Sequence, residues 1–322
     1  MLQLRSQLPL GFVALMLLCL GGNTACAEVQ HFTVPSTEVD PAMKLVPGDH
    51  SYWVNNAVPP RGELLIFITG TGGRSQGPDE FFRTAANVGY HVIMPLYAND
   101  VPAAVCAGDP ARAAFENFRR EIIEGRDLTP LLEVGPADSI NNRILKLVQW
   151  LKQHRPPEEN WGQFFDKDGG FIWRKVVLAG HSQGGGHALL MAQDHEVARV
   201  IMTGAPKDFS QARHKPAAWY RPGKTPVSRM FALNHEQDFQ GCSPTEQLEN
   251  YTAARLAPVR NVDQLAPPYD HAHAFTTNFP GTALDSGTAH ISVIIARAAP
   301  RDADGAPHFK LVWLYMLTEP VE

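Results

Sequence analysis

One stretch of about twenty residues constrains the fold of this chain more than any other. Residues 175–180 are a short apolar run, residues 180–184 read Gly-His-Ser-Gln-Gly, and residues 183–194 have the composition of a helix. A serine on such a strand-to-helix turn projects its hydroxyl above the sheet. Larger residues two positions before or after it would clash with neighbouring backbone. The pattern predicts a nucleophilic Ser182 on a strained turn, with an ordinary glycine turn as the alternative.

Apolar runs and helical patterns alternate along the rest of the chain. Strands are predicted at residues 64–69, 91–96, 175–180, 198–203, 228–234 and 275–279. Helices are predicted at residues 79–88, 111–124, 138–154 and 183–194, and from the Ser-Pro-Thr-Glu sequence at 243–246, whereas 309–317 is a helix or a strand. Residues 28–60 are expected to be irregular, with a short strand at 50–54. This alternation predicts an α/β fold, with a mainly parallel sheet, helices on both faces and loop excursions over its carboxyl edge.

The N-terminal residues have the form of a secretory leader. Arg5 is the only charge before Glu28, an apolar run covers residues 8–20, and Ala25-Cys26-Ala27 has the small-x-small form of a cleavage site. The run is too short to span a membrane, and no later apolar stretch reaches that length. We therefore expect residues 1–27 to be removed, leaving 28–322 as one secreted or periplasmic domain. A lipid anchor on Cys26 is the alternative.

Only two cysteines lie outside the predicted leader. Of the four cysteines, two lie in residues 1–27, which leaves Cys106 and Cys242. Two cysteines in an oxidising compartment predict one disulfide, with two unrelated buried thiols as the alternative.

Charge and spacing exclude several kinds of partner. With 28 basic and 33 acidic residues, the formal net charge is −5, so a nucleic-acid binder is excluded. There is no Cys-x-x-Cys pair, and no histidine pair has a zinc-binding helical spacing. We expect no metal and no cofactor.

The turn around Ser182 and two further features resemble the α/β-hydrolase superfamily over most of residues 60–320. Loops such as Ala98-Asn99-Asp100 and the segment 289–293 resemble a group of secreted, largely uncharacterised bacterial hydrolases. The first further feature is the loop 69–73, Thr-Gly-Thr-Gly-Gly, directly after the first apolar strand. The resemblance implies that the backbone N–H groups of Thr71 and Gln183 form an oxyanion hole. A phosphate-binding loop is the rival interpretation, but the loop lacks the Gly-Lys-Ser/Thr ending.

The second further feature is the order of residues after Ser182. The fold requires the nucleophile, then an acid, then a histidine. Asp238, just beyond strand 228–234, is the first candidate for the acid, and Asp208 and Glu236 are alternatives. The segment 287–293 offers His290 as the base.

Other residues are candidates for the base or for the walls of the substrate site. His271 and His273 are the alternative bases, whereas His181 is not expected to act as one. Four aromatic residues are candidates for lining an acyl site: Phe209, Trp219, Tyr220 and Phe239.

These residues predict a secreted serine hydrolase that cleaves a small-molecule or lipid ester through Ser182, His290 and Asp238. Two alternatives stay open. One is a peptidase or amidase with the same triad, and the other is a hydrolase fold without activity that serves as a binding protein.

Overall fold

A nine-stranded sheet forms the centre of the structure, a computed structural model that describes residues 28–74 and 77–321. Its strand order is β1-β2-β4-β3-β5-β6-β9-β11-β10. The strands are β1 (Gln30–Pro35), β2 (Asp49–Val54), β3 (Leu64–Ile68), β4 (His91–Met94), β5 (Val176–His181), β6 (Arg199–Thr203), β9 (Met230–His235), β10 (Val259–Asn261) and β11 (Ala274–Thr277). The predicted leader, residues 1–27, lies outside the described residues.

Most neighbouring strands run parallel. The strand β2 pairs antiparallel with both β1 and β4, and the pairs from β4 through to β10 are all parallel. The central strands β3, β5, β6 and β9 are buried along their whole length, as the apolar run in the middle of each predicts. Their carboxyl ends meet at one edge of the sheet, and the loops at this edge carry the candidate site.

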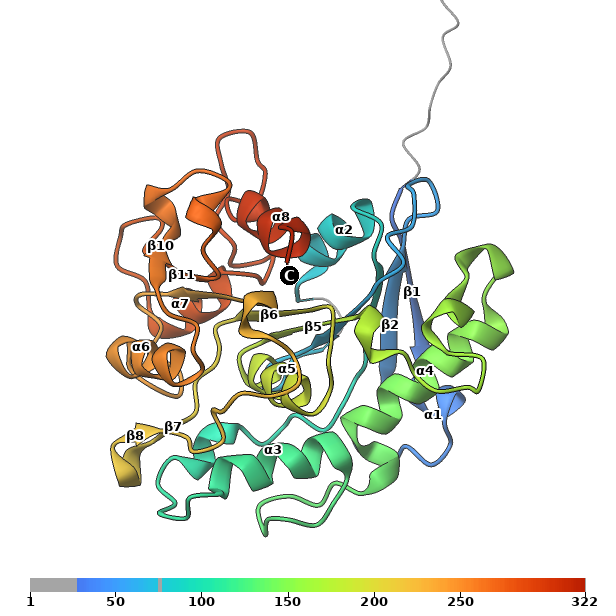
Figure 1. Ribbon diagram of the computed structural model, residues 1–322, viewed down its shortest axis with the longest axis horizontal. Coiled ribbons are helices and arrows are strands. Elements are labelled where there is room, and N and C mark those ends of the chain that lie inside the picture. The colour runs from blue at the N-terminus through green and yellow to red at the C-terminus, as the bar shows by residue number, and fades with distance from the viewer. Residues whose placement is uncertain (1–27, 75–76, 322) are drawn as a thin grey trace, which may run out of the picture.

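Helices cover both faces of this sheet, which confirms the predicted fold class (Figure 1). The helices are α1 (Ser36–Val39), α2 (Asp79–Asn87), α3 (Ala114–Glu124), α4 (Ile140–His154), α5 (Gln183–Asp194), α6 (Pro244–Ala253), α7 (Ser286–Ser292) and α8 (Lys310–Thr318). One face is covered by α3, α4 and α5, and the other by α2 and α8, which meet at an edge-to-face contact between Phe81 and Trp313.

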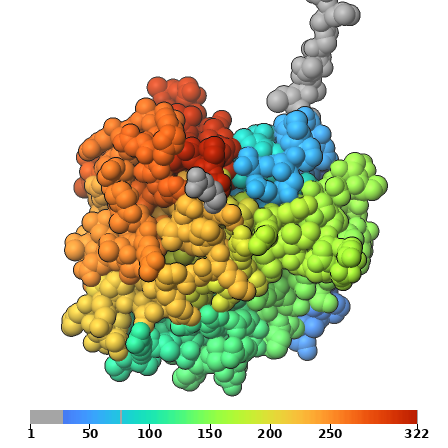
Figure 2. Space-filling view, in the orientation of Figure 1, coloured from blue at the N-terminus to red at the C-terminus, as the bar shows by residue number. Residues whose placement is uncertain are grey.

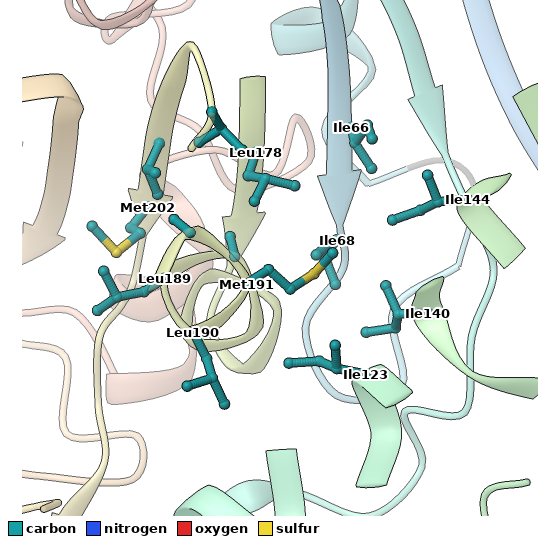
Figure 3. Close-up of a cluster of buried hydrophobic side chains, with 14 of the residues drawn as sticks. Ile66, Ile68, Ile123, Ile140, Ile144, Leu178, Leu189, Leu190, Met191 and Met202 are labelled. Carbon is teal, nitrogen blue, oxygen red and sulfur yellow. The ribbon is translucent and has the colours of Figure 1, made fainter. Parts of the chain in front are cut away.

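Alternate side chains of one strand enter the two cores. In β3, Leu64, Ile66 and Ile68 pack beneath α3, α4 and α5, whereas Leu65 and Phe67 pack against α2 and α8. Figure 3 shows the first of these clusters, with Ile68 among side chains from α3, α4 and α5. A strand buried on both faces is apolar along most of its length, so this part of the fold can be predicted from the sequence.

The two ends of the sheet differ from the prediction. Residues 28–60 are not largely irregular, because β1 pairs with β2 over six residues. At the other edge, β10 is a three-residue strand that was not predicted. Residues 310–318 form a helix, which is one of the two possibilities that the sequence leaves open for 309–317. The short strands β7 (Phe209–Ser210) and β8 (Lys215–Pro216) pair within the excursion after β6. In Figure 2 the C-terminal segments, coloured orange and red, form one flank of the visible surface.

Candidate active site

Ser182 lies on the turn between β5 and α5 with a backbone conformation that strains a residue with a side chain. Its φ is 56° and its ψ is −123°. A Cβ at Gly184 would lie 2.0 Å from the carbonyl oxygen of Ile68, and one at Gly180 would lie 2.4 Å from the carbonyl carbon of Gly184. Both positions therefore need glycine, and the turn has the strained geometry that the sequence predicts.

Asp238 and His290 are brought together at the same edge of the sheet. Asp238 follows β9 and is buried, and His290 is near the end of α7, so the two residues come from segments 52 positions apart in sequence. The Nδ1 atom of His290 lies 2.7 Å from Oδ2 of Asp238. An ionised carboxylate accepts hydrogen bonds and donates none, so the hydrogen of this bond is on Nδ1 of His290 and the lone pair is on Nε2.

Lys207 shares the same carboxylate oxygen. Its ammonium lies 3.1 Å from Oδ2 of Asp238, and its side chain is only 8% exposed. Burial raises the pKa of the Asp238 carboxyl, but the hydrogen bond from His290 and the charges of His290 and Lys207 outweigh it, so the pKa lies below its ordinary value. Asp238 is therefore ionised at neutral pH, where it can stabilise an imidazolium.

A cavity of about 890 Å³ lies over Ser182 and His290. Its walls come from the loop after β3, the segment around Ala103, the start of α5, Lys207 and Asp208 after β6, and the residues around Ile291. Within the described residues, Ser182 Oγ forms no hydrogen bond, so the contact between nucleophile and base is not made in this arrangement. Such catalytic bonds are often long in free enzymes and tighten with substrate.

The two residues predicted for the oxyanion hole are in contact. Thr71 Oγ1 donates to Oε1 of Gln183 at 3.0 Å, and the same oxygen accepts from the backbone N–H of Ala103 at 2.7 Å. The Gln183 side chain thus joins the loop after β3 to the wall at Ala103. The backbone N–H groups of Thr71 and Gln183 form no backbone hydrogen bond with the described residues. Two free donors beside Ser182 are what an oxyanion needs.

His181 lies closer to the base than its place in the turn indicates. Its ring centroid is 4.6 Å from that of His290, and its Nδ1 lies 3.0 Å from the carbonyl oxygen of Thr203. Burial lowers the pKa of His181 well below its ordinary value, and the nearby His290 lowers it further. A neutral ring therefore packs against the candidate base.

Asp208 and Glu236, the alternative acids, have other partners. Asp208 forms a buried two-pronged ion pair with Arg119, with both N···O distances 2.6 Å, and it also accepts a hydrogen bond from Trp219 Nε1 at 2.8 Å. Glu236 is exposed and accepts hydrogen bonds from two surface side chains, those of Asn261 and Thr276. Of the three carboxylates, only Asp238 is hydrogen-bonded to a histidine.

Arg119 also connects this ion pair to the turn. Its Nη1 donates to the backbone carbonyl of Gln183 at 2.8 Å, and a Cβ at Gly186 would lie 2.3 Å from the guanidinium carbon. Arg119 is not among the residues predicted from the sequence. The available signal is its position on the apolar face of the helix, four residues after Phe115 and three before Ile122, both of which are buried.

The alternative bases lie elsewhere. His271 pairs with Glu319 at 2.5 Å and is exposed, and His273 stacks on Phe231 with its Nδ1 3.2 Å from the carbonyl oxygen of Met230. Neither of them lines the cavity over Ser182.

The aromatic residues proposed for an acyl site do not line the cavity either. Phe209, Trp219 and Tyr220 are buried, and the Trp219 indole is engaged with Asp208. Phe239 is 60% exposed. The apolar part of the wall comes instead from residues such as Phe67, Ile291 and Ile295.

The predicted disulfide is wrong, because both cysteines are free and buried. The thiol of Cys106 lies 3.7 Å from the carbonyl oxygen of Ala114, and that of Cys242 lies 3.6 Å from Oε1 of Gln247. Each sulfur therefore packs against the helix that follows it in the chain, α3 and α6 respectively. Although both loops leave the carboxyl edge of the sheet, their cysteines face separate helices.

Residues 28–74 and 77–321 include no helix that is long and apolar enough to cross a membrane. In the same residues, no group of three or more histidine, cysteine or acidic side chains is arranged to hold a metal ion.

The mainly parallel sheet, its helices on both faces and the turn at Ser182 between β5 and α5 give the chain an α/β-hydrolase fold. Neither a protein-family model nor a curated protein matches the sequence. Among solved structures, the chain is similar to one described as a "Putative Dienelactone Hydrolase" from Klebsiella pneumoniae subsp. pneumoniae. The two share 12% identity with a TM-score of 0.39, over 81% of this chain and 89% of the other.

Proposed function

We propose that this protein is a serine hydrolase that cleaves a carboxylic ester through Ser182, His290 and Asp238. The observation that carries the proposal is the 2.7 Å contact between Nδ1 of His290 and Asp238, beside a cavity that both His290 and Ser182, on its strained turn, line. An acid that fixes the tautomer, a base with a free Nε2 and a projecting hydroxyl are the three parts of nucleophilic catalysis by serine.

The reaction proceeds in two halves. Ser182 Oγ attacks the ester carbonyl carbon while Nε2 of His290 takes the hydroxyl proton, and the same nitrogen then gives that proton to the leaving alcohol. Water then attacks the acyl-enzyme while Nε2 of His290 takes a proton from it, and the same nitrogen returns that proton to Ser182 Oγ as the carboxylic acid leaves. Throughout, Asp238 stabilises the imidazolium without itself taking the proton.

Charge also develops on the carbonyl oxygen during both halves. The N–H groups of Thr71 and Gln183 are proposed to hold this oxyanion. Two contacts support their positions: Thr71 donates to the Gln183 side chain, and Arg119 donates to the Gln183 carbonyl. The oxyanion hole is therefore braced from both sides of the turn.

Labelling with a fluorophosphonate tests the proposal. This reagent modifies an activated serine, so the wild-type protein should be labelled and the Ser182→Ala protein should not. The substitution should also abolish hydrolysis of 4-nitrophenyl esters without changing the unfolding midpoint, because the hydroxyl forms no hydrogen bond with the described residues. An unlabelled wild-type protein would instead support a binding function.

A comparison of esters with matched amides separates the esterase from a peptidase or amidase.

The predicted leader at residues 1–27 also leads us to propose that the enzyme acts outside the cytoplasm. Mass spectrometry of the exported protein tests this point, since cleavage after Ala27 gives a mature chain that begins at Glu28.

A further inference from the structure

The cavity over Ser182 is lined by more cationic than anionic side chains. Four basic residues contribute to its walls, namely Arg74, Arg119, Lys207 and Arg297, whereas Asp208 is the one carboxylate among the described lining residues. A cavity with this excess favours a ligand of opposite charge.

Three of these cations already have a carboxylate partner. Arg119 is paired with Asp208 at 2.6 Å. Lys207 is paired with Asp238 at 3.1 Å, and Arg74 with Asp100 at 2.9 Å.

The fourth cation, Arg297, is different. The part of the chain that the structure describes offers its exposed side chain no hydrogen bond and no ion pair. It is therefore the cation of this cavity whose charge is available to a ligand.

Arg297 lies on the same segment of the chain as the candidate base His290. Arg297 follows α7, the helix that carries His290. Ile291 and Ile295 lie between His290 and Arg297 in sequence, and both line the same cavity. The backbone N–H of Ala296 donates to the carbonyl of Gly77 at 3.0 Å, which ties this segment to the opposite strand-to-helix connection. This one segment of the chain therefore contributes the base, two apolar side chains and a guanidinium to the cavity wall.

We propose that Arg297 binds a carboxylate carried by the ester substrate, at the far end of an apolar segment from the scissile bond. The planar guanidinium matches a carboxylate through two parallel hydrogen bonds. One free guanidinium balances one negative charge, whereas a phosphate monoester would bring nearly two. This inference rests on the proposed ester hydrolysis and names its substrate class.

A matched pair of six-carbon esters tests the proposal. The neutral member is 4-nitrophenyl hexanoate, and the anionic member is the mono-4-nitrophenyl ester of hexanedioic acid. In wild-type protein kcat/KM should be at least about tenfold higher for the anionic ester, the factor given by about 1.4 kcal/mol. Added salt should reduce this preference.

Three variants assign the preference to Arg297. In Arg297→Gln the ratio of the two kcat/KM values should fall about tenfold, and in Arg297→Lys it should be intermediate, because an ammonium is a point charge. Arg112→Gln removes the same charge from an exposed residue that does not line the cavity, and it should keep the wild-type ratio. A wild-type ratio of one or less would overturn the proposal, as would equal effects of the Arg112 and Arg297 substitutions.

A binding measurement separates this proposal from the proposed reaction. Monomethyl hexanedioate, added to Ser182→Ala protein in a calorimeter, should bind at least about tenfold more tightly than to Ser182→Ala/Arg297→Gln protein. Such a difference would support the carboxylate site even if wild-type protein hydrolysed neither ester, a result that would count against the proposed function alone. Equal or absent binding in the two proteins would refute the carboxylate site.

Discussion

The guanidinium of Arg119 and the carboxylate of Asp208 form an ion pair with both N···O distances 2.6 Å and side chains 2% and 3% exposed. This relationship gives Asp208 a structural role. A charge buried this deeply is tolerated only with its partner, so removal of one member leaves the other uncompensated.

Asp208→Asn should therefore act on stability. Its free energy of unfolding should fall by about 3–5 kcal/mol, the usual cost of breaking a buried pair. Urea unfolding followed by fluorescence measures this change. If Asp208→Asn were as stable as wild type but lost activity, Asp208 would be the triad acid and the assignment of Asp238 would fail.

Asp238→Asn should act on catalysis. An amide in place of the carboxylate favours the wrong tautomer of His290, and the corresponding change in a serine protease triad lowers kcat by about 10⁴. Steady-state kinetics with a 4-nitrophenyl ester measures the effect. Glu236→Gln is the matched control, since Glu236 is exposed and bonded only to surface side chains, and it should retain wild-type kcat.

The pH dependence of stability should report on His187. This side chain is fully buried in α5, neither ring nitrogen has a hydrogen-bond partner within the described residues, and burial together with Arg119 lowers its pKa well below the ordinary value. Below about pH 6.5, His187 binds a proton in the unfolded chain but stays neutral in the folded protein. Stability should therefore fall as pH falls, by up to about 1.4 kcal/mol per pH unit for this group.

Comparison of variants isolates that contribution. In His187→Leu the slope of unfolding free energy between pH 6.5 and 4.5 should be less steep by about one proton, whatever the absolute stability. His154→Gln alters an exposed histidine and should leave the slope unchanged. Parallel curves for wild type and His187→Leu would show that the buried imidazole takes up its proton without unfolding.

The thiols of Cys106 and Cys242 should be free but unreactive in the native protein. Burial raises the pKa of each to about 12, so little thiolate forms at neutral pH. Alkylation without prior reduction, followed by peptide mass spectrometry, should modify both cysteines in denaturant and neither in the native state. A reducing agent should leave the unfolding midpoint unchanged, and recovery of a cross-linked peptide would contradict the structure.

The sequence is informative where a local rule specifies the structure. Continuous apolar runs identify β3 and β5 because strands buried on both faces cannot alternate, and the glycines around Ser182 mark a turn that admits no larger residue. The three-residue strand β10 has no such pattern, and β1 is largely exposed, so neither leaves a clear signal.

Contacts between side chains that are distant in sequence are harder to predict. Lys207 follows β6 at the carboxyl edge of the sheet, where functional groups gather, but nothing local indicates that it shares an oxygen of Asp238 with His290. The cysteine prediction failed for a related reason. Position at the same sheet edge does not fix the direction in which a side chain points, and each thiol turns to its own neighbouring helix.

The contact between Gly186 and Arg119 has a consequence for how this site can change in evolution. An alanine at 186 would place a carbon 2.3 Å from the guanidinium carbon of Arg119, so the arginine side chain would have to move. Such a movement would weaken its ion pair with Asp208 and its hydrogen bond to the Gln183 carbonyl. The three positions are therefore coupled: a larger residue at 186 disturbs the arginine, and loss of the arginine leaves the aspartate without its counter-charge.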